Sequence, residues 1–492
     1  MFETAEVGNE VSKADFKKEV PKLRVDLLEA QNTLAKSDFS LMLLIGGVEG
    51  AGKTEFANRL LEWLDARGIE THAWAEPTDE ERERPPFWRF WRVLPGKGKA
   101  AFLLNSWYTS PIINRVYKKN DEAEFDRQLD RVAAFERMLA QENVLLVKLW
   151  FHLSKKEQKK RLKDLEADPD NRWRVTPRDW KFHKRYDRFR KVSERAIMKT
   201  NTSEAPWIIL EATDRRYRDL AGVRCILNAI RKKAKEAAAQ PKAEKTPDLP
   251  KPKPKNVLRS MDLTKKLDDK NYDKQLEKLQ GRLALLARRL REESKRSLLL
   301  VFEGSDAAGK GGCIRRITQA LDARNYQLRS VAAPTDEERA RPYLWRFWRG
   351  LPRIGRVTIY DRSWYGRVLV ERVEGFAKPE AWGRAFGEIN AFEDELTEFG
   401  TIVMKFWVTI SPEEQLKRFK DRQEKAYKQY KITEEDWRNR AKWNAYEAAA
   451  CDMIERTNTE RAPWVLVEGE DKNWARVKVL RAVVDALERE LS

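Results

Sequence analysis

The stretch from Val301 to Gly312, "VFEGSDAAGKGG", has the residue types and spacing of a phosphate-binding loop. The pattern G-x-x-x-x-G-K-[ST] places glycines where the backbone approaches phosphate oxygens and a lysine as a positive charge on the phosphates. Lys310 fits it, but Gly311 stands where such loops have the hydroxyl that holds magnesium. Phosphate contacts are expected from the glycines of the loop, Gly304, Gly309, Gly311 and Gly312.

Two acids near this loop are candidate ligands of a metal ion. Asp306 lies inside the loop, and Asp361 follows an apolar run in "VTIYDRSWY", where it should end a strand. Together they could hold Mg²⁺ between donor and acceptor phosphates, with Asp306 helping to compensate for the hydroxyl missing at Gly311. Arg362 could bind a phosphate in a bidentate manner. The alternatives are a helix cap or surface ion pair for each acid, and a structural salt bridge for Arg362.

The pattern of strands and helices around these residues indicates an α/β domain. "SLLLVFEG", "RVTIYDRSWY", "TIVMKFWVTI" and "APWVLVEG" are apolar runs typical of buried parallel strands, and long helical stretches separate them. This alternation predicts a central parallel sheet flanked by helices. Ligands of such sheets bind at the carboxyl ends of the strands, where the loop and "DRSWY" would emerge.

The chain is a tandem duplication. "GVEGAGKT" at Gly47 recurs as "GSDAAGKG" at Gly304, 257 residues later, and "PTDEER", "WRFWR" and "SWY" recur at the same offset. A Pro- and Lys-rich segment separates the copies and has the composition of a linker. We therefore predict two domains of one fold, each led by a helix, at residues 1–235 and 263–492, with a linker at 236–262.

The first copy departs from the second where chemistry is expected. Leu104 and Asn105 stand opposite Asp361 and Arg362, and Glu49 stands opposite Asp306. Without the acid that positions a metal, the first copy should be catalytically impaired, serving a structural or regulatory role. It could still bind a phosphate chain through its own loop.

A basic stretch, "LKRFKDRQEKAYKQYKITEEDW", follows the third of these strands and is expected to be helical. Such a run is most often a solvated helix face. In a kinase fold, however, a lid closes here over the donor, and its cations neutralise charge on the transferred group. We expect donor contacts from a subset of four basic residues, Arg418, Arg422, Lys425 and Lys428.

Composition restricts the class of partner. The 492 residues carry a formal charge of +19, which indicates a polyanion such as nucleic acid, a membrane surface or a phosphate polymer. No DNA- or RNA-binding motif is visible, and no apolar run reaches the length of a membrane span. The amino terminus also lacks the apolar core of a signal peptide, so a cytoplasmic protein that binds neither nucleic acid nor membrane is expected.

"FEGSDAAGKGG", "PTDEER", "YDRSWY" and the basic lid together resemble the polyphosphate kinase 2 family. The resemblance implies a thymidylate-kinase-like P-loop fold and, for two-domain members, Mg²⁺-assisted phosphorylation of AMP to ADP from inorganic polyphosphate. A glycine at the Ser/Thr position and an internal aspartate are usual in that family's loop. Its functional positions correspond here to Asp306, Lys310, Asp361 and Arg362, and to basic residues of the lid.

The stretch "PTDEERARPYLWRFWRG" is expected to contact the acceptor. Arg346 and Arg349 are three residues apart and would share a helix face, where they could hold the acceptor's phosphate, whereas Trp345 and Trp348 more plausibly pack in the core. The nucleotide-binding residues expected in this stretch are Thr335, Glu338, Arg346 and Arg349.

Two rival functions remain open on the sequence. The same fold supports an ATP-dependent nucleoside monophosphate kinase, and the positive charge would also suit a non-enzymatic binder of polyanions or nucleic acid. All three histidines lie in the first copy, so the second can form no phosphohistidine and direct in-line transfer is favoured. Whether the fused copies associate further into a homo-oligomer is open.

Overall fold

The structure, a computed structural model, describes residues 1–239 and 256–492. These residues form two compact units, whose main parts are residues 1–77 with 89–239 and residues 256–334 with 346–492. Most of the predicted linker, residues 240–255, lies outside the described residues. The first residues of the predicted linker, 236–238, are the last residues of helix α10 (Arg215–Ala238).

Within the described residues, each unit contains one five-stranded sheet in which every pairing is parallel. The strand orders are β2-β3-β1-β4-β5 and β7-β8-β6-β9-β10, so β1 and β6 are central. The strands of the first unit are β1 (Ser40–Gly47), β2 (Ile69–Ala73), β3 (Ala100–Leu104), β4 (Val144–His152) and β5 (Trp207–Glu211). Those of the second are β6 (Ser297–Gly304), β7 (Tyr326–Ser330), β8 (Val357–Asp361), β9 (Thr401–Thr409) and β10 (Trp464–Glu468).

Strand bounds in the second unit equal those in the first plus 257, which confirms the duplication and the absence of net insertions between loop and last strand. The four predicted strands of the second copy are confirmed. The edge strand β7 was missed because its sequence, "YQLRS", is largely polar and three of its five residues are exposed. An edge strand needs less apolar surface than a central one, since only one neighbour covers it.

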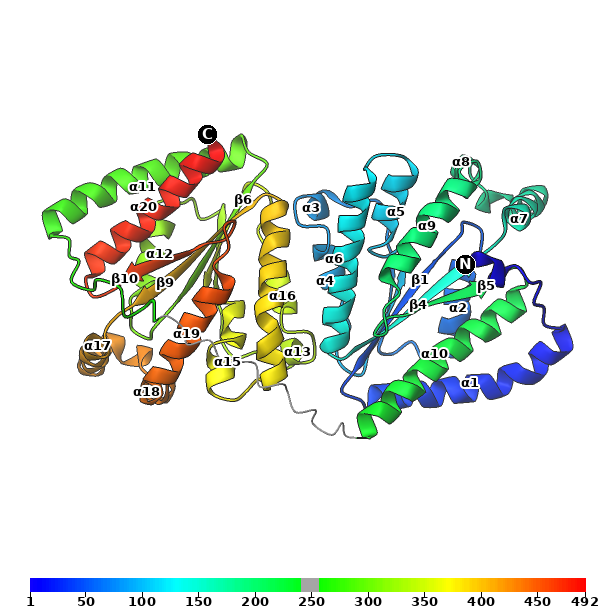
Figure 1. Ribbon diagram of the computed structural model, residues 1–492, viewed down its shortest axis with the longest axis horizontal. Coiled ribbons are helices and arrows are strands. Elements are labelled where there is room, and N and C mark those ends of the chain that lie inside the picture. Colours follow the sequence, from blue (N-terminus) through cyan, green and yellow to red (C-terminus); the bar gives the residue numbers. More distant parts are fainter. Residues whose placement is uncertain (240–255) are drawn as a thin grey trace. The chain divides into compact units, whose positions relative to one another are not determined.

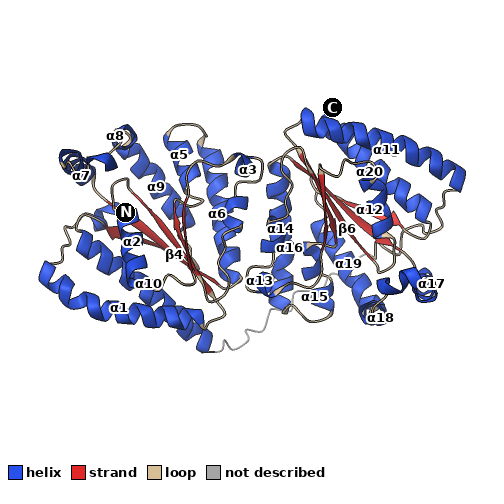
Figure 2. Ribbon diagram, turned by 180° about the vertical axis from the view of Figure 1, so that it is seen from behind, coloured by secondary structure: helices blue, strands red, loops and turns tan. Residues whose placement is uncertain are grey.

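Helices cover both faces of each sheet (Figure 1; Figure 2). In the first unit α1 (Lys13–Ala35), α2 (Lys53–Trp63) and α10 pack on one face, and α6 (Glu122–Gln141) and α9 (Tyr186–Thr200) on the other. Their equivalents in the second unit are α11 (Asp269–Glu292), α12 (Lys310–Thr318), α20 (Lys472–Leu491), α16 (Pro379–Glu398) and α19 (Trp443–Thr457). The confirmed leading helices, α1 and α11, lie beside α10 and α20.

Each copy of the sequence also contains shorter helices. In the first copy these are η1 (Phe2–Ala5), α3 (Asp79–Arg82), α4 (Trp88–Trp91), α5 (Thr109–Val116), α7 (Lys155–Ala167), η2 (Arg172–Arg174) and α8 (Pro177–His183). In the second they are α13 (Asp336–Arg339), α14 (Trp345–Trp348), η3 (Trp364–Arg367), α15 (Val370–Val373), α17 (Pro412–Glu424), η4 (Ala426–Lys431) and α18 (Glu434–Ala441).

The central strands are largely apolar because both of their faces are covered. In β1, Leu41, Leu43 and Ile45 join one core with α1, α2 and α10. In β6, Leu298, Leu300 and Phe302 form the equivalent core of the second unit.

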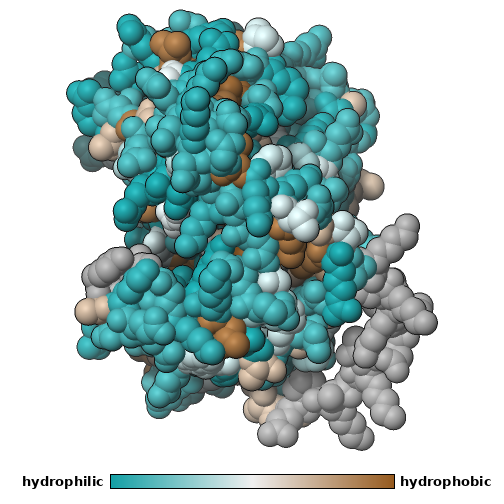
Figure 3. All heavy atoms as spheres, turned by 90° about the vertical axis from the view of Figure 1, so that its left-hand side faces the viewer, coloured by the Kyte–Doolittle hydropathy of each residue, from teal (hydrophilic) through white to brown (hydrophobic). Residues whose placement is uncertain are grey.

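The surface is rich in charge, in keeping with the composition. The face drawn in Figure 3 is largely hydrophilic, with small separated apolar patches. Among the described helices, none combines the length and the hydropathy needed to cross a membrane.

Candidate active site

The phosphate loop joins the central strand β6 to α12 in the second unit. Gly304 has φ 140°, and a Cβ atom there would lie 2.1 Å from the carbonyl oxygen of Val408 in β9, so only glycine allows the strands to pair. Gly309, with φ 110°, precedes α12 in the left-handed region. Gly311 and Gly312 have room for a side chain, so the backbone itself does not require glycine at either position. They leave space open at the start of α12.

Lys310 places its ammonium group at the centre of the loop. Its Nζ donates hydrogen bonds to the carbonyl oxygens of Gly304 (2.7 Å) and Ser305 (3.1 Å). Burial, and then the charge of Arg362, lower the pKa of Lys310, while nearby acids oppose the shift. The lysine is therefore positioned as a cation that an incoming phosphate group can approach.

Asp306 connects the loop to two other parts of the site. Its Oδ1 accepts a hydrogen bond from Nη2 of Arg362 at 2.7 Å, and its Oδ2 accepts one from Nδ2 of Asn439 in α18 at 2.9 Å. The structure thus brings together the internal aspartate of the loop and the arginine that follows β8, as the strand topology predicted. Asn439 was not anticipated.

Asp361 ends β8 beside β6, where it is paired in register with Phe302. The next residue, Arg362, has φ 63°, a left-handed conformation that turns the chain sharply after the acid. A third carboxylate, Glu303, is buried below the loop and accepts a hydrogen bond from Oγ of Ser363 at 2.8 Å. Burial raises the pKa of Glu303. The loop is therefore surrounded by both acids and cations.

A cavity of about 380 Å³ opens beside the loop. Its polar end is formed by Gly304, Asp306, Arg362 and Asn439. Its other walls are largely apolar and include Leu258, Met261, Leu369, Trp407 and Trp443. Nε1 of Trp407 is buried and has no hydrogen-bond partner among the described residues. The cavity therefore suits a ligand with an anionic end and a flat apolar body.

One wall of this cavity comes from residues 256–268, the segment that precedes α11, which we call the strap. Leu258 is buried, and Arg259 anchors the segment by donating Nε and Nη2 hydrogen bonds to Glu447 in α19, at 3.0 and 2.7 Å. Asn256 bonds to the same carboxylate at 3.1 Å. The strap includes the last residues, 256–262, of the linker predicted from the sequence, so part of that segment belongs to the site.

The basic stretch predicted to be a helical lid is helical, and it consists of α17, the short 3₁₀ helix η4 and α18. Helix α17 ends at Glu424, and α18 begins after Thr433, whose side chain and that of Asp436 form a capping box. Arg422 lies in the last turn of α17. Lys425 follows it and pairs with Asp421 at 2.5 Å. The side chain of Lys428 lies outside the described residues.

Arg418 is placed differently from the expectation that it contacts the donor. It is buried, and its guanidinium donates hydrogen bonds to carbonyl oxygens of Ala307, Ala308, Gly469 and Glu470 at 2.8–3.0 Å. These bonds tie the phosphate loop to the segment after β10. We therefore treat Arg418 as a residue that positions the loop.

The expected acceptor residues lie outside the cavity lining. Thr335 and Glu338 form a capping box with each other at the start of α13. The interpretation that Arg346 and Arg349 share a helix face is wrong, because α14 is a single turn that ends before Arg349. Nη1 of Arg346 donates to the carbonyl oxygen of Ala332 at 3.0 Å. The tryptophans at both ends of α14 are buried, which confirms their core role.

The "SWY" motif is held by a buried ion pair. Nζ of Lys405 in β9 lies 2.7 Å from Glu393 of α16, and both side chains are essentially inaccessible. The same carboxylate accepts hydrogen bonds from Nε1 of Trp364 (3.0 Å) and the hydroxyl of Tyr365 (2.7 Å). These bonds orient the chain immediately after Asp361.

Comparison with known proteins agrees with this geometry. The model of the polyphosphate kinase 2 family matches residues 10–238 and again residues 266–492. The chain belongs to the polyphosphate kinase 2 family.

Relatives of known name match the whole tandem chain. Polyphosphate:AMP phosphotransferase of Pseudomonas aeruginosa is 50% identical over 99% of both chains. The protein of the same name from Acinetobacter johnsonii is 38% identical over 94% of this chain and 95% of its own. A crystal structure from Pseudomonas aeruginosa assigned to polyphosphate kinase 2 covers 100% of this chain and 99% of its own, with a TM-score of 0.90 and 48% identity.

Three parts of this polyphosphate kinase 2 site escaped the sequence analysis. Glu303 could have been found, because it is a carboxylate in an otherwise apolar strand. Asn439 has no such signal, since it lies 133 residues from Asp306 and meets it only when α18 folds back. The strap was missed because residues 256–262 were assigned to the linker and residues 263–268 to the start of the second domain.

Proposed function

We propose that the second copy transfers a phosphoryl group from inorganic polyphosphate to AMP, giving ADP. The observation that carries the proposal is the contact of Asp306 with Arg362 beside Lys310, at the polar end of a cavity with apolar walls. The names of the full-length relatives support these substrates. A phosphate oxygen of AMP attacks the terminal phosphorus of the chain, the bridging P–O bond breaks, and a polyphosphate one unit shorter leaves.

The residues present fit Mg²⁺. No cluster of three or more His, Cys, Asp or Glu side chains forms a metal site in the part of the chain that the structure describes. Mg²⁺ does not require one, because it is commonly held by one or two carboxylates together with phosphate oxygens and water. Asp306 and Asp361 would be those carboxylates, and the bound ion would neutralise charge shared by donor and acceptor.

The protein's own side chains would orient the two substrates. Lys310 and Arg362 would hold phosphate oxygens, with Arg362 exchanging part of its contact with Asp306 for the substrate. The apolar cavity walls would cover the nucleoside, to which Nε1 of Trp407 offers a hydrogen bond. A phosphate chain has no apolar surface, so we assign the cavity to AMP and the exposed lid side to the donor.

The function is tested by incubating purified protein with AMP and long-chain polyphosphate in the absence of ATP. We expect ADP to form only with Mg²⁺ and polyphosphate present. A nucleoside monophosphate kinase would require ATP, and a donor competition between ATP and polyphosphate distinguishes the two. Binding of polyanions without any turnover would instead favour the non-enzymatic alternative.

Neutralising the lid should weaken donor binding. We expect Arg422→Gln with Lys425→Gln to raise the apparent KM for polyphosphate about 2–10-fold, and to change that for AMP less, because a polyanion makes repeated charge contacts. Initial rates at several salt concentrations measure this, and the difference from wild type should shrink as salt rises. Equal effects on both substrates would argue against a donor-side lid. The first copy has Leu165 and Asp168 at these positions.

Truncating the side chain of Leu258 in the strap should weaken acceptor binding. Leu258→Ala removes part of the cavity wall, and we expect the KM for AMP to rise about tenfold while the KM for polyphosphate stays close to wild type. Ser260→Ala, at an exposed position of the same segment, is the control. If both KM values change together, or neither does, the assignment of this wall to AMP fails.

We further propose that turnover belongs to the second copy alone, because the first lacks equivalents of Asp361 and Arg362. The nucleotide roles of Thr335, Glu338, Arg346 and Arg349 stay predictions, as do the cytoplasmic location and any association into a homo-oligomer.

A further inference from the structure

The first copy contains a cavity of its own, of about 300 Å³, beside its phosphate loop. Lys53 keeps the loop geometry of its equivalent, with Nζ 3.2 Å from the carbonyl oxygens of both Gly47 and Val48. Away from the loop six aromatic side chains line the cavity, which are Tyr108, Trp150, Phe182, Tyr186, Phe189 and Trp207. Loss of the catalytic acids has therefore not filled this cavity.

The charge around the loop has changed sign between the copies. In the second copy six positions carry four carboxylates and two cations, which are Glu303, Asp306, Asp361, Glu435, Lys310 and Arg362. The equivalent positions, 257 residues earlier, are Gly46, Glu49, Leu104, Arg178, Lys53 and Asn105, in the same order. They carry only one carboxylate and two cations. The formal charge of the set rises from −2 to +1. A phosphate group can therefore enter the first copy without a metal ion to offset the acids.

The ring of Trp150, the equivalent of Trp407 in the second copy, borders the space that the buried acid occupies in that copy. A Cβ atom on Gly46 would lie 3.4 Å from the Trp150 ring, so the ring borders the place of the Glu303 side chain. Trp150 is 3% exposed and lines the cavity, and its Nε1 has no hydrogen-bond partner among the described residues. A buried donor of this kind normally has an acceptor, which a bound ligand would supply.

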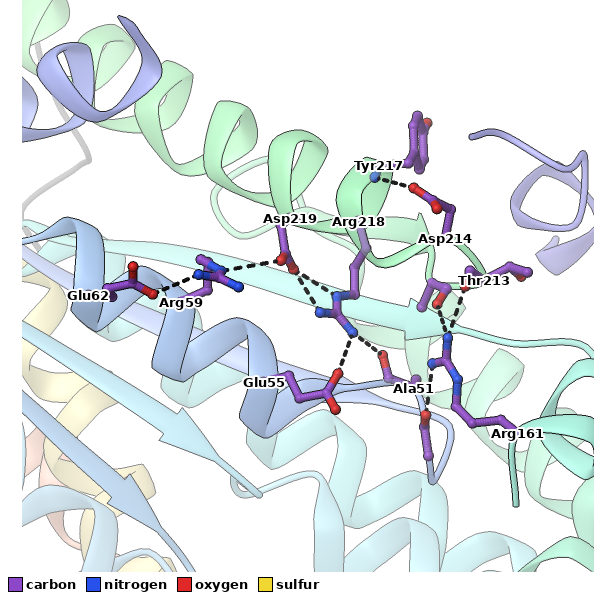
Figure 4. Close-up of polar contacts among 12 residues, drawn as sticks. Ala51, Glu55, Arg59, Glu62, Arg161, Thr213, Asp214, Tyr217, Arg218 and Asp219 are labelled. Carbon is purple, nitrogen blue, oxygen red and sulfur yellow. Dashed lines mark hydrogen bonds and ion pairs between the residues drawn. The ribbon is translucent and has the colours of Figure 1, made fainter. Parts of the chain in front are cut away.

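The loop of the first copy is held in shape by two arginines (Figure 4). Arg161 donates to the carbonyl oxygens of Gly50 (3.0 Å) and Thr213 (2.9 Å). Arg218, which is 1% exposed and paired with Asp219 at 2.8 Å, donates to the carbonyl oxygen of Ala51 at 3.3 Å. The second copy has Ala475 in place of Arg218. A loop fixed in this way needs no ordering when an anion binds.

We infer that the first copy is a non-catalytic nucleotide-binding site that works without a divalent metal. The phosphate group lies on the loop N–H groups and Lys53, with Arg178 as a further cation of the cavity lining, and the base lies among the aromatic side chains. Glu49, 3.3 Å from Lys53, is 48% exposed and can turn toward solvent when phosphate takes its place. Inorganic polyphosphate would leave the aromatic walls uncovered, so a nucleoside phosphate fits better.

The site is tested by equilibrium binding of AMP to the full chain in EDTA. We expect one AMP per chain to bind, and Lys53→Ala to weaken this binding about 10–100-fold, because a charged contact to phosphate is lost. Lys310→Ala, the same change in the loop of the second copy, should change the affinity for this AMP by no more than about twofold. Lys119→Ala controls for the loss of one exposed positive charge. Absence of metal-free binding, or equal loss with Lys53→Ala and Lys310→Ala, would overturn the inference.

Two further measurements keep the test decisive. Arg178→Glu restores the acid found at Glu435 and should also weaken AMP binding, so the result does not depend on Lys53→Ala folding normally. Tripolyphosphate, which has no base, should displace AMP poorly at equal concentration. If tripolyphosphate displaces AMP as effectively as ADP does, the site binds phosphate chains and the assignment to nucleotides is wrong. Because binding in EDTA requires no transfer, failure of the proposed catalytic function would not affect either result.

Discussion

Asp361→Asn should lower the rate of ADP formation about 10²–10³-fold while leaving the protein folded. Asp361 ends β8 beside the phosphate loop, where a carboxylate can hold a metal ion against phosphate oxygens. Asparagine keeps the size of the side chain and removes its charge. The loss should appear in kcat at saturating AMP and polyphosphate, because the contact is strongest when charge develops in the transition state.

The control for this prediction is Asp273→Asn, the same change at an exposed position of α11. It should retain wild-type turnover. Thermal unfolding of both variants verifies that each is folded. If Asp361→Asn turns over at close to the wild-type rate, Asp361 does not position the metal and the proposed site must be revised.

Lys405→Met should lower the free energy of unfolding of the second unit by about 3–5 kcal/mol. The substitution leaves the carboxylate of Glu393 buried without its cation. It also removes hydrogen bonds of Nζ to the hydroxyl of Tyr365 (3.0 Å) and the carbonyl oxygen of Thr457 (2.6 Å). Urea unfolding followed by circular dichroism and by residual ADP formation measures the effect.

Adding Glu393→Gln to Lys405→Met should recover part of this stability. Glutamine removes the uncompensated charge and keeps an oxygen that can accept from Trp364 and Tyr365. Lys278→Met, at an exposed position of α11, should have little effect. A double variant less stable than Lys405→Met alone would mean that the charge of Glu393 is not the source of the loss.

Much of the fold was predictable because its signals are local or repeat along the chain. The apolar run "SLLLVFEG" specifies a strand with both faces covered, and the glycines after it specify the turn into α12. The constant offset of 257 residues required the two halves to share one fold. Where the local signal was weak, as in the polar edge strand β7, the element was not predicted.

The sequence by itself determined which residues have the chemistry of the site. Lys310, Asp306, Asp361 and Arg362 were proposed as site residues from type and spacing, because a phosphate loop and a strand-end acid are recognisable before folding. The loss of Asp361 and Arg362 equivalents from the first copy was visible in the same way.

Only the tertiary structure decided which of the charged residues face the cavity beside the phosphate loop. Arg418 looked equivalent to Arg422 in a basic stretch, yet its guanidinium is buried among four backbone carbonyls. The carboxamide of Asn439 reached Asp306, and the strap closed a cavity wall, through contacts between segments far apart in the chain. Sequence spacing sets which residues share an element, but the sheet order and the packing of the lid set which side chains meet, and burial then decides whether a charge serves the fold or the ligand.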